Sequence, residues 1–233
     1  MSMPFYVSPE QVMKDRADYA RKGIARGRSL VGIEFADGVA IVAENTSGTL
    51  YKTSEIYDRI AFAGVGKYSE FEQLKIAGVR HADLKGYAYS REDVTARSLA
   101  NAYAQTLGQV FTHEMKPYEV EILVAQVSER ADEPNELYHI FYDGTMMDEH
   151  GFTVLGGQAE AITEAVKNSF TEGLALGGAV QLCTSALGAP DSRTLSAEQL
   201  EVAVLDRNQP RRHFRRIKDA ELTGLLSGAG AKA

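Results

Sequence analysis

Apolar and polar residues alternate near the beginning of the chain with the two-residue period of a β-strand. From Ser29 to Phe35, successive side chains would point to opposite faces, and Val39 to Ala43 is a short, β-rich apolar run. Ala36-Asp37-Gly38, which lies between the two runs, is a tight-turn signal. The pattern therefore predicts an antiparallel hairpin, followed by a third strand at about Arg59 to Gly64.

The same signals return in the second half of the chain. Alternation is clear from Tyr118 to Val127, where Val120, Ile122 and Val124 would share one face of a strand. Asp143-Gly144 marks the turn of a second hairpin. Strands are predicted over residues 118–127, 137–142, 145–148, 151–155, 200–205 and 213–217.

Capping signals mark a helix close to the N-terminus, over residues 8–27. Ser8 can cap this helix, Pro9 suits its first position, and Gln11 completes a capping box. Basic residues gather at its far end, where cations interact favourably with the helix dipole, and Gly27 follows as a stop signal. Residues 1–7, which precede the helix, are predicted to form a mobile arm.

Further helices are predicted from the 3.6-residue period and from caps. One spans about Lys67 to Leu84. The next begins after Ser90, where Asp93 gives another capping box, and it stops before Pro117. Shorter helices are predicted over residues 159–172, 175–187 and 219–226.

The order of the elements predicts the fold class. It runs helix, three strands, two helices, about four strands, two helices, two strands and one helix. Because strands come in runs joined by tight turns, we expect antiparallel sheets, whereas a doubly wound parallel sheet would alternate strands with helices. We therefore predict an α+β fold, a four-layer αββα sandwich of two antiparallel sheets with an extra N-terminal helix. One domain is expected over residues 8–227, and a disordered tail over residues 228–233.

Composition and charge narrow the function. Hydrophobic residues make up 44 % of the 233 residues, which is enough for a sizeable core. The net charge of −7 argues against a nucleic-acid partner. The single cysteine, Cys183, excludes an internal disulfide and a cysteine-rich metal site. The sequence shows no signal-peptide pattern and no apolar run of membrane-spanning length, so we expect a cytoplasmic protein without a membrane partner.

Motifs for phosphate, metal or covalent chemistry are weak. Gly64-Val65-Gly66-Lys67 lies between a strand and a helix, but Ala61 and Tyr68 stand where a P-loop needs a glycine and a hydroxyl residue. The histidines lack zinc-helix spacing, and no G-x-S-x-G motif is present. Cys183 lies among apolar helix residues, which favours a buried, inert thiol. We predict no cofactor and no metal.

A basic run covers residues 210–218 and holds five basic residues in nine. Because the whole chain is acidic, we interpret this run as a solvated strand face or an intersubunit salt-bridge surface rather than a nucleic-acid patch.

Several segments, in their order and spacing, resemble one family. Tyr19-Ala20-Arg21 near the end of the first helix, then Gly27, and then the hairpin from Ser29 to Val39 are similar to proteasome α subunits. Lys116-Pro117-Tyr118-Glu119-Val120 resembles the Arg-Pro-Tyr-Gly-Val segment that opens a strand in this family. Three further segments look like actinobacterial members: residues 8–13, 21–26 and 86–89.

The resemblance implies the fold of the N-terminal nucleophile hydrolases without their chemistry. In the family's β subunits, the catalytic threonine is the first residue of the mature chain and opens the first strand. Alignment through Val31-Gly32 puts Arg28 at that position and Glu44 at the acidic partner. The catalytic lysine would fall near Arg59 or Ile60. Because arginine has no nucleophilic hydroxyl, the resemblance implies that this chain has no catalytic residue.

The resemblance also implies an assembly and two sites. Seven copies would form an outer ring on a ring of β subunits, receive a ring ATPase, and admit unfolded, Pup-tagged polypeptides. The gate of the central pore would consist of Met3, Pro4, Phe5, Tyr6, Val7, Ser8 and Pro9. Lys52 matches the family's lysine in a pocket between adjacent α subunits, where its ammonium group pairs with the terminal carboxylate of an activator tail.

The chain departs from the family near the gate. Ser8-Pro9-Glu10-Gln11 lacks the glycine of the family's turn, the spacing to Tyr19 is one residue longer, and the tyrosine-aspartate-arginine motif is missing from the arm. The archaeal scheme for holding the gate open is therefore not expected to carry over.

Two alternatives remain open from the sequence. In the first, cleavage after Arg28 would expose Ser29, or loss of Met1 would expose Ser2, as the nucleophile of a self-processing hydrolase. In the second, the chain is a monomeric binding protein that has no affinity for β subunits.

Overall fold

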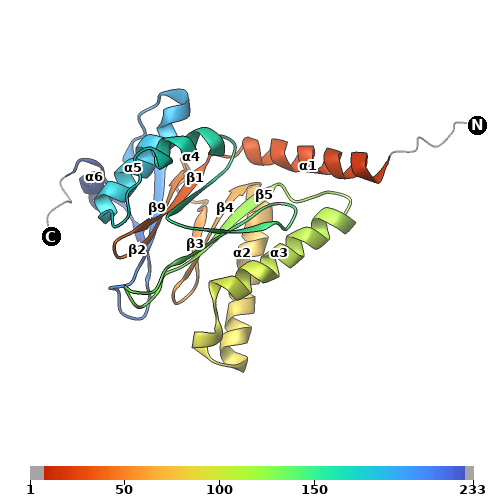
Figure 1. Cartoon of the computed structure of the whole chain (residues 1–233), viewed down its shortest axis with the longest axis horizontal. Coiled ribbons are helices and arrows are strands. Elements are labelled where there is room, and N and C mark those ends of the chain that lie inside the picture. Colours follow the sequence, from red (N-terminus) through yellow and green to blue (C-terminus); the bar gives the residue numbers. More distant parts are fainter. Residues whose placement is uncertain (1–7, 229–233) are drawn as a thin grey trace, which may run out of the picture.

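Two five-stranded antiparallel sheets lie face to face at the centre of the molecule (Figure 1). The computed structural model describes residues 8–228. The first sheet has the order β10-β9-β2-β1-β8 and consists of β1 (Leu30–Phe35), β2 (Gly38–Glu44), β8 (Phe152–Leu155), β9 (Leu200–Asp206) and β10 (Phe214–Ile217). The second has the order β3-β4-β5-β6-β7 and consists of β3 (Thr53–Tyr57), β4 (Ile60–Gly66), β5 (Val120–Gln126), β6 (Glu136–Ile140) and β7 (Met146–Glu149).

Helices cover the outer face of each sheet. The second sheet packs against α2 (Tyr68–Ala88) and α3 (Ala96–His113). The first sheet packs against α4 (Ala159–Lys167), α5 (Leu176–Gly188) and α6 (Asp219–Leu226). Short 3₁₀ turns lie at residues 91–93, 189–191 and 197–199. The predicted four-layer αββα sandwich is confirmed.

The two-residue period assigns each strand residue to a layer. Val31, Ile33 and Phe35 of β1 face the helices outside the first sheet. Leu30 faces inward, into the core between the two sheets. The prediction that Val120, Ile122 and Val124 share one face of β5 is confirmed, and the structure shows that this face packs under α2 and α3.

An additional helix, α1 (Pro9–Ala25), precedes the sandwich and lies across one end of it (Figure 1). As predicted, Ser8 caps it: the Ser8 Oγ accepts from the Gln11 backbone N–H at 3.2 Å. The Gln11 side-chain amide donates instead to Asp15 Oδ1, one turn further on, at 2.6 Å.

The second half of α1 is held against the body. Ala20 and Ile24 are buried in the core between the sheets. Arg16 Nη1 donates to the Phe111 carbonyl oxygen at the end of α3, at 2.7 Å. By contrast, residues 8–15 are all exposed. The exposed residues 8–15 therefore form an overhang, whereas the second half of α1 belongs to the core.

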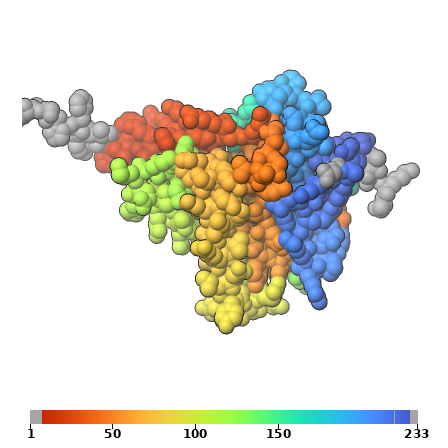
Figure 2. Space-filling view, turned by 180° about the vertical axis from the view of Figure 1, so that it is seen from behind, coloured from red at the N-terminus to blue at the C-terminus, as the bar shows by residue number. Residues whose placement is uncertain are grey.

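The space-filling view from behind shows two projecting ends (Figure 2). One is the beginning of α1, where Val12 and Met13 are exposed. The other is the end of α2, which lies away from α1 and exposes Leu84, Tyr87 and Tyr89. Both ends present apolar side chains that have no packing partner within the described residues.

The first difference from the sequence-based prediction is strand β3. The segment Thr53–Tyr57 is mostly polar, and only Thr53 and Ile56 are buried. In addition, its pairing with β4 shifts register between Glu55 and Tyr57. Such an irregularity breaks the two-residue alternation on which the prediction of a strand depends.

Helix boundaries are the second difference. Helix α2 continues to Ala88, beyond the predicted end. Ser90 caps the short turn at residues 91–93, whereas α3 begins later, with Thr95 as its cap. Helix α4 stops at Lys167, and the Phe170 ring then packs on Phe152, with ring centroids 5.4 Å apart. These boundaries depend on packing between distant segments, which capping signals do not describe.

Candidate functional site

The site that the sequence analysis singled out lies at the mouth of the sandwich, the end where β1 begins and β2 ends. Arg28 directly precedes Ser29 and β1, and Glu44 is the last residue of β2. The Glu44 backbone N–H donates to the Ser29 carbonyl oxygen at 3.1 Å, which places the two strand ends side by side. The Arg28 guanidinium forms an ion pair with the Glu44 carboxylate. The structure thus brings together the two positions expected from the resemblance.

Arg193, which is distant in the sequence, also forms an ion pair with Glu44. It follows the 3₁₀ turn at residues 189–191, and its Nη1 and Nη2 donate to Glu44 Oε1 and Oε2 at 2.7 and 3.1 Å. The Glu44 side chain is only 5 % exposed. Burial raises the pKa of Glu44, but the hydrogen bonds from Arg193 and the charges of Arg28 and Arg193 outweigh it, so the pKa lies below its ordinary value. Glu44 is therefore a buried carboxylate held between two guanidinium groups.

Lys52 reaches the same place from the beginning of β3. Its Nζ donates to the Arg28 carbonyl oxygen at 2.5 Å. Burial lowers the pKa of Lys52 to about 8; the charge of Arg28 acts in the same direction, whereas Glu201 and Glu44 oppose the shift. Lys52 is therefore poised between its charged and neutral forms near physiological pH.

The position expected for the family's catalytic lysine was wrong. Arg59 pairs with Glu129 at 3.6 Å, and Ile60 packs beneath α2 and α3, in the outer core. The lysine beside Arg28 and Glu44 is Lys52. Because β3 was not predicted, the length of the loop before it was not known, and counting along the chain could not locate this lysine.

Glu201 is a second buried carboxylate at the mouth, and the sequence analysis missed it. It lies on β9 and is 7 % exposed. Its Oε2 accepts from the Lys52 backbone N–H and from Asn45 Nδ2, at 2.8 and 2.7 Å. Its Oε1 accepts from the backbone N–H and the hydroxyl of Thr53, at 2.9 and 2.5 Å. An acidic residue inside an apolar strand was the signal that could have identified it.

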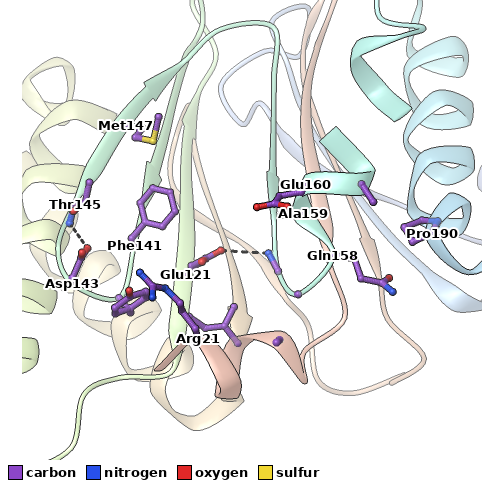
Figure 3. A pocket seen from close by; sticks show the side chains of 16 residues that line it. Arg21, Glu121, Phe141, Asp143, Thr145, Met147, Gln158, Ala159, Glu160 and Pro190 are labelled. Atoms are coloured by element: carbon purple, nitrogen blue, oxygen red, sulfur yellow. Dashed lines mark hydrogen bonds between the residues drawn. The ribbon is translucent and has the colours of Figure 1, made fainter. Parts of the chain in front are cut away.

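A separate cavity of about 830 Å³ flanks α1 on the other side (Figure 3). Arg21 and Glu121 point into it, and Phe141 and Met147 form its apolar wall. Its polar groups are largely paired with the protein itself: Asp143 Oδ1 accepts from the Thr145 backbone N–H at 2.9 Å, and Glu121 Oε2 accepts from that of Gly156 at 3.4 Å. These two carboxylates are therefore engaged by backbone N–H groups of the protein itself.

Two of the predicted gate residues, Ser8 and Pro9, lie at the opposite end of α1. Met3, Pro4, Phe5, Tyr6 and Val7 lie outside the described residues. Ser8 and Pro9 are exposed at the first turn of α1. Because α1 has 17 residues, about 25 Å of helix separates them from the mouth. The two predicted sites are therefore distinct.

The other candidate features have structural roles. Cys183 is fully buried, and burial raises the pKa of its thiol. In the basic run, Arg212 pairs with Glu55, Arg215 pairs with Glu221, and Arg216 Nη2 donates to the Thr53 carbonyl oxygen. These contacts are within the chain, so the expected intersubunit salt-bridge surface is not needed to satisfy these arginines.

Within residues 8–228, no group of three or more histidine, cysteine, aspartate or glutamate residues could hold a metal ion. No helix in the same range has both the length and the apolar character required to cross a membrane.

Comparisons with known proteins identify one family. Residues 24–205 match the family model described as "Proteasome subunit". Proteins named "Proteasome subunit alpha" from Kineococcus radiotolerans and Xylanimonas cellulosilytica are each 56 % identical to this chain, over 99 % and 100 % of it and all of the relative. A third, from Thermomonospora curvata, is also 56 % identical, over 97 % of the chain and 99 % of the relative.

Proposed function

Because this chain belongs to the proteasome subunit family, we propose that it is a non-catalytic α subunit of the proteasome core particle. Seven copies form an outer ring, which stacks on β subunits that carry the proteolytic threonine. The chain needs no cofactor for this role. Its substrates are unfolded, Pup-tagged polypeptides in the cytoplasm.

The observation that best supports this proposal is the identity of the residue at the nucleophile position. Arg28 stands at the start of the first strand, and its guanidinium is held by Glu44. An N-terminal nucleophile hydrolase needs a hydroxyl or thiol at this point, together with a free α-amino group. Here the position has a basic side chain and an amide bond to the preceding helix, so it supports no acyl transfer.

The alternative that uses Ser29 conflicts with the packing of α1. Cleavage after Arg28 would release a segment whose Ala20 and Ile24 belong to the core between the sheets. Ser29 itself is buried, and its carbonyl oxygen already accepts from the Glu44 backbone N–H. Exposing Ser29 would therefore disrupt the site that it is meant to activate.

The overhang of α1 supports assembly into a ring. Its exposed first half has Val12 and Met13 at 36 % and 37 % exposure. Met13 also lies on the same helix face as Ala17, Ala20 and Ile24, so the buried stripe continues past the edge of the body. A neighbouring copy that covers this stripe would bury it, as the ring requires.

Two finer roles follow from the same proposal. Met3 to Pro9 form the gate at the centre of the ring, and Ser8 and Pro9 lie at the free end of the α1 overhang. Lys52 receives the terminal carboxylate of a ring ATPase tail in a pocket between adjacent copies. Its ammonium group already lies against the Arg28 carbonyl oxygen, where a second acceptor can approach it.

Co-expression with the matching β subunit tests the proposal. We expect a particle of several hundred kilodaltons by size-exclusion with light scattering, and hydrolysis of a fluorogenic peptide that is lost when the β threonine is replaced by alanine. An intact mass for this chain that begins at Met1 or Ser2 is also expected. A monomer that cleaves the peptide without the β subunit, or a mature chain that begins at Ser29, would reject the proposal in favour of a hydrolase.

A further inference from the structure

We propose that Glu201 is the positioning residue of the Lys52 pocket: its buried carboxylate fixes the loop from Asn45 to Lys52 so that the Lys52 ammonium stands at the mouth of the sandwich, ready for a partner's terminal carboxylate. The inference rests on the docking role proposed for Lys52 and deepens it. It assigns a residue 149 positions further along the chain to the same site.

The contacts of Glu201 converge on one short segment. Its two oxygens accept four hydrogen bonds, from the Lys52 and Thr53 backbone N–H groups, the Thr53 hydroxyl and the Asn45 amide. A carboxylate is a pure acceptor with two oxygens, so each of these donors is matched. Two of the donors are the backbone groups of Lys52 itself and of the next residue. The carboxylate therefore sets the main-chain position from which the Lys52 side chain extends.

The loop is also anchored at both ends: the Asn45 backbone N–H donates to the Gln199 carbonyl oxygen at 2.8 Å, and the Lys52 carbonyl oxygen accepts from the Gly64 backbone N–H at 3.0 Å. Asn45 Nδ2 also donates to the Leu50 carbonyl oxygen at 2.8 Å, and the Ser47 hydroxyl accepts from the Leu50 backbone N–H at 3.0 Å. These bonds shape the loop internally, but they do not attach it to the sheets. Residues 48–50 are exposed. Glu201, which lies on β9 in the first sheet, accepts from the two consecutive backbone N–H groups of Lys52 and Thr53, and Arg216 of β10 adds a second link through the Thr53 carbonyl oxygen.

Because the Glu201 carboxylate is buried, its hydrogen-bond donors have little freedom to move. Because Glu201 is 7 % exposed, water cannot readily replace a donor that moves away, and a buried carboxylate with unmatched oxygens is costly. Glu201 therefore holds the Lys52 backbone together with the Gly64 backbone N–H, which donates to the Lys52 carbonyl oxygen. A docking site with its cation already in position binds without the entropic cost of ordering a lysine on a free loop.

The charge of Glu201 acts on Lys52 as well. It opposes the effect of burial, which lowers the pKa of Lys52. Removing this charge would leave more of Lys52 neutral at physiological pH. Glu201 therefore supports docking twice, by geometry and by keeping the ammonium group charged.

The variant Glu201→Gln tests the inference in the assembled particle. Glutamine keeps the shape but replaces one accepting oxygen by an NH2 group, so the backbone N–H of either Lys52 or Thr53 must lose its acceptor, and the negative charge is removed in both cases. With a ring ATPase as activator, and each rate divided by the same variant's basal rate, we expect the half-saturating activator concentration to rise about tenfold, as Lys52→Ala should do. Glu198→Gln is the matched control: it changes the same charge on an exposed residue three positions away, and it should behave as wild type.

An independent readout follows Lys52 itself. The rate at which an acylating reagent modifies the Lys52 amine is measured against pH by mass spectrometry on the full-length chain. In Glu201→Gln, the midpoint of this profile should move to lower pH, and in Glu198→Gln it should stay in place. If Glu201→Gln does not fold, Asn45→Ala removes one of the four donors at a half-buried position, and it should raise the half-saturating concentration by a smaller factor.

The outcomes separate this inference from the docking role. A Lys52→Ala effect without a Glu201→Gln effect would overturn the inference and leave docking intact. If Lys52→Ala has no effect, the docking role fails, and the acylation profile alone then decides whether Glu201 positions Lys52. An unchanged profile in Glu201→Gln would overturn the positioning role as well.

Discussion

Arg28, Lys52 and Arg193 bring three basic side chains to the mouth of the sandwich, and Glu44 and Glu201 are the buried anions that face them. At the scale of single residues, the mouth therefore holds an ionic network in which three cations meet two buried carboxylates. Such a network offers a fixed cation to an anionic partner.

The pKa of Lys52 makes a prediction about pH. Because the pKa of Lys52 is about 8, the ammonium form dominates below this pH and is lost as the pH rises through it. A terminal carboxylate binds only the charged form strongly. Activator stimulation of peptide hydrolysis should therefore fall as the pH rises from about 7 to about 9.

Two variants identify the responsible group. Lys52→Arg should remain charged throughout this range and flatten the pH profile, because arginine does not lose its proton. Lys52→Ala should give weak stimulation at every pH. A profile in Lys52→Arg that still falls near pH 8 would show that another group titrates, and that Lys52 does not control docking.

The Glu44 network makes a prediction about stability. Replacing Arg193 by alanine removes a bidentate partner from a buried carboxylate, although Arg28 remains. We expect the free energy of unfolding to fall by about 1–3 kcal/mol, less than for a buried charge left with no partner. The expected loss is measured by chemical denaturation at pH 7.

The control is another arginine with an ion pair at the surface. Arg130 pairs with Asp132 where both side chains are about two-thirds exposed, so Arg130→Ala should change the stability by less than about 0.5 kcal/mol. Because the pKa of Glu44 is lowered in the folded state, its contribution is present above the unfolded pKa and is lost as the pH falls through the folded one. The difference between Arg193→Ala and wild type should therefore shrink in acid.

At the scale of elements, only the second half of α1 packs against the rest of the chain, and its first half is exposed. Propensity alone does not hold the exposed turns, since short isolated helices are marginal in water. We expect Met13→Gln to reduce the fraction of chains that assemble with β subunits, while the stability of the unassembled chain changes by less than about 0.5 kcal/mol. Light scattering and thermal unfolding measure the two effects.

Lys14→Gln is the matched control, because it introduces the same side chain at the next exposed position. It should assemble as wild type does. Equal assembly of both variants would remove Met13 from the contact between copies.

Helices α2 and α3 approach each other closely at Gly78 and Tyr103. A Cβ atom at Gly78 of α2 would lie 1.7 Å from the Tyr103 hydroxyl oxygen of α3. Gly78→Ala should therefore destabilise the fold by roughly 1–3 kcal/mol, although alanine is the better helix former. Thermal or chemical unfolding measures the loss.

Replacing Tyr103 by phenylalanine should restore part of the stability lost in Gly78→Ala. The Tyr103 hydroxyl is buried and has no hydrogen-bond partner in the structure, so its removal alone should cost little. In the double variant, the nearest ring carbon would be 2.7 Å away, so part of the stability lost in Gly78→Ala should return. Strictly additive effects of the two changes would contradict this packing argument.

At the scale of the whole molecule, the two proposed sites lie apart. The beginning of α1 projects from one side of the sandwich (Figure 1). The ion pair of Arg28 and Glu44 lies at the mouth, beyond the other end of α1. Deleting residues 2–7 keeps Ser8 as the helix cap and should leave assembly unchanged. We expect the assembled particle to hydrolyse peptides faster, because the proposed gate has been removed.

A full-length particle in which Met3 is replaced by leucine is the control, since it keeps the bulk of the arm. Its rate should equal that of wild type. No gain in rate on deletion would reject the gate role of Met3 to Pro9, and it would leave the α-subunit proposal itself in place.

The sequence by itself determined the fold class, the order of nearly all elements and the absence of a nucleophilic hydroxyl at Arg28. These follow from local signals: two-residue alternation in Val31, Ile33 and Phe35, the cap at Ser8, and turns such as Asp37-Gly38. Each signal is set by neighbours along the chain, so one sequence is enough to read it.

Only the tertiary structure decided which distant residues meet at the mouth. It brought Lys52, rather than Arg59 or Ile60, to Arg28, and it added Arg193 and Glu201 from the last part of the chain. Strand β3 was missed because its irregular pairing hides the alternation, and without it the loop before β3 had no known length. Contacts between residues about 150 positions apart depend on how the two sheets stack, and no periodicity within either segment specifies that stacking.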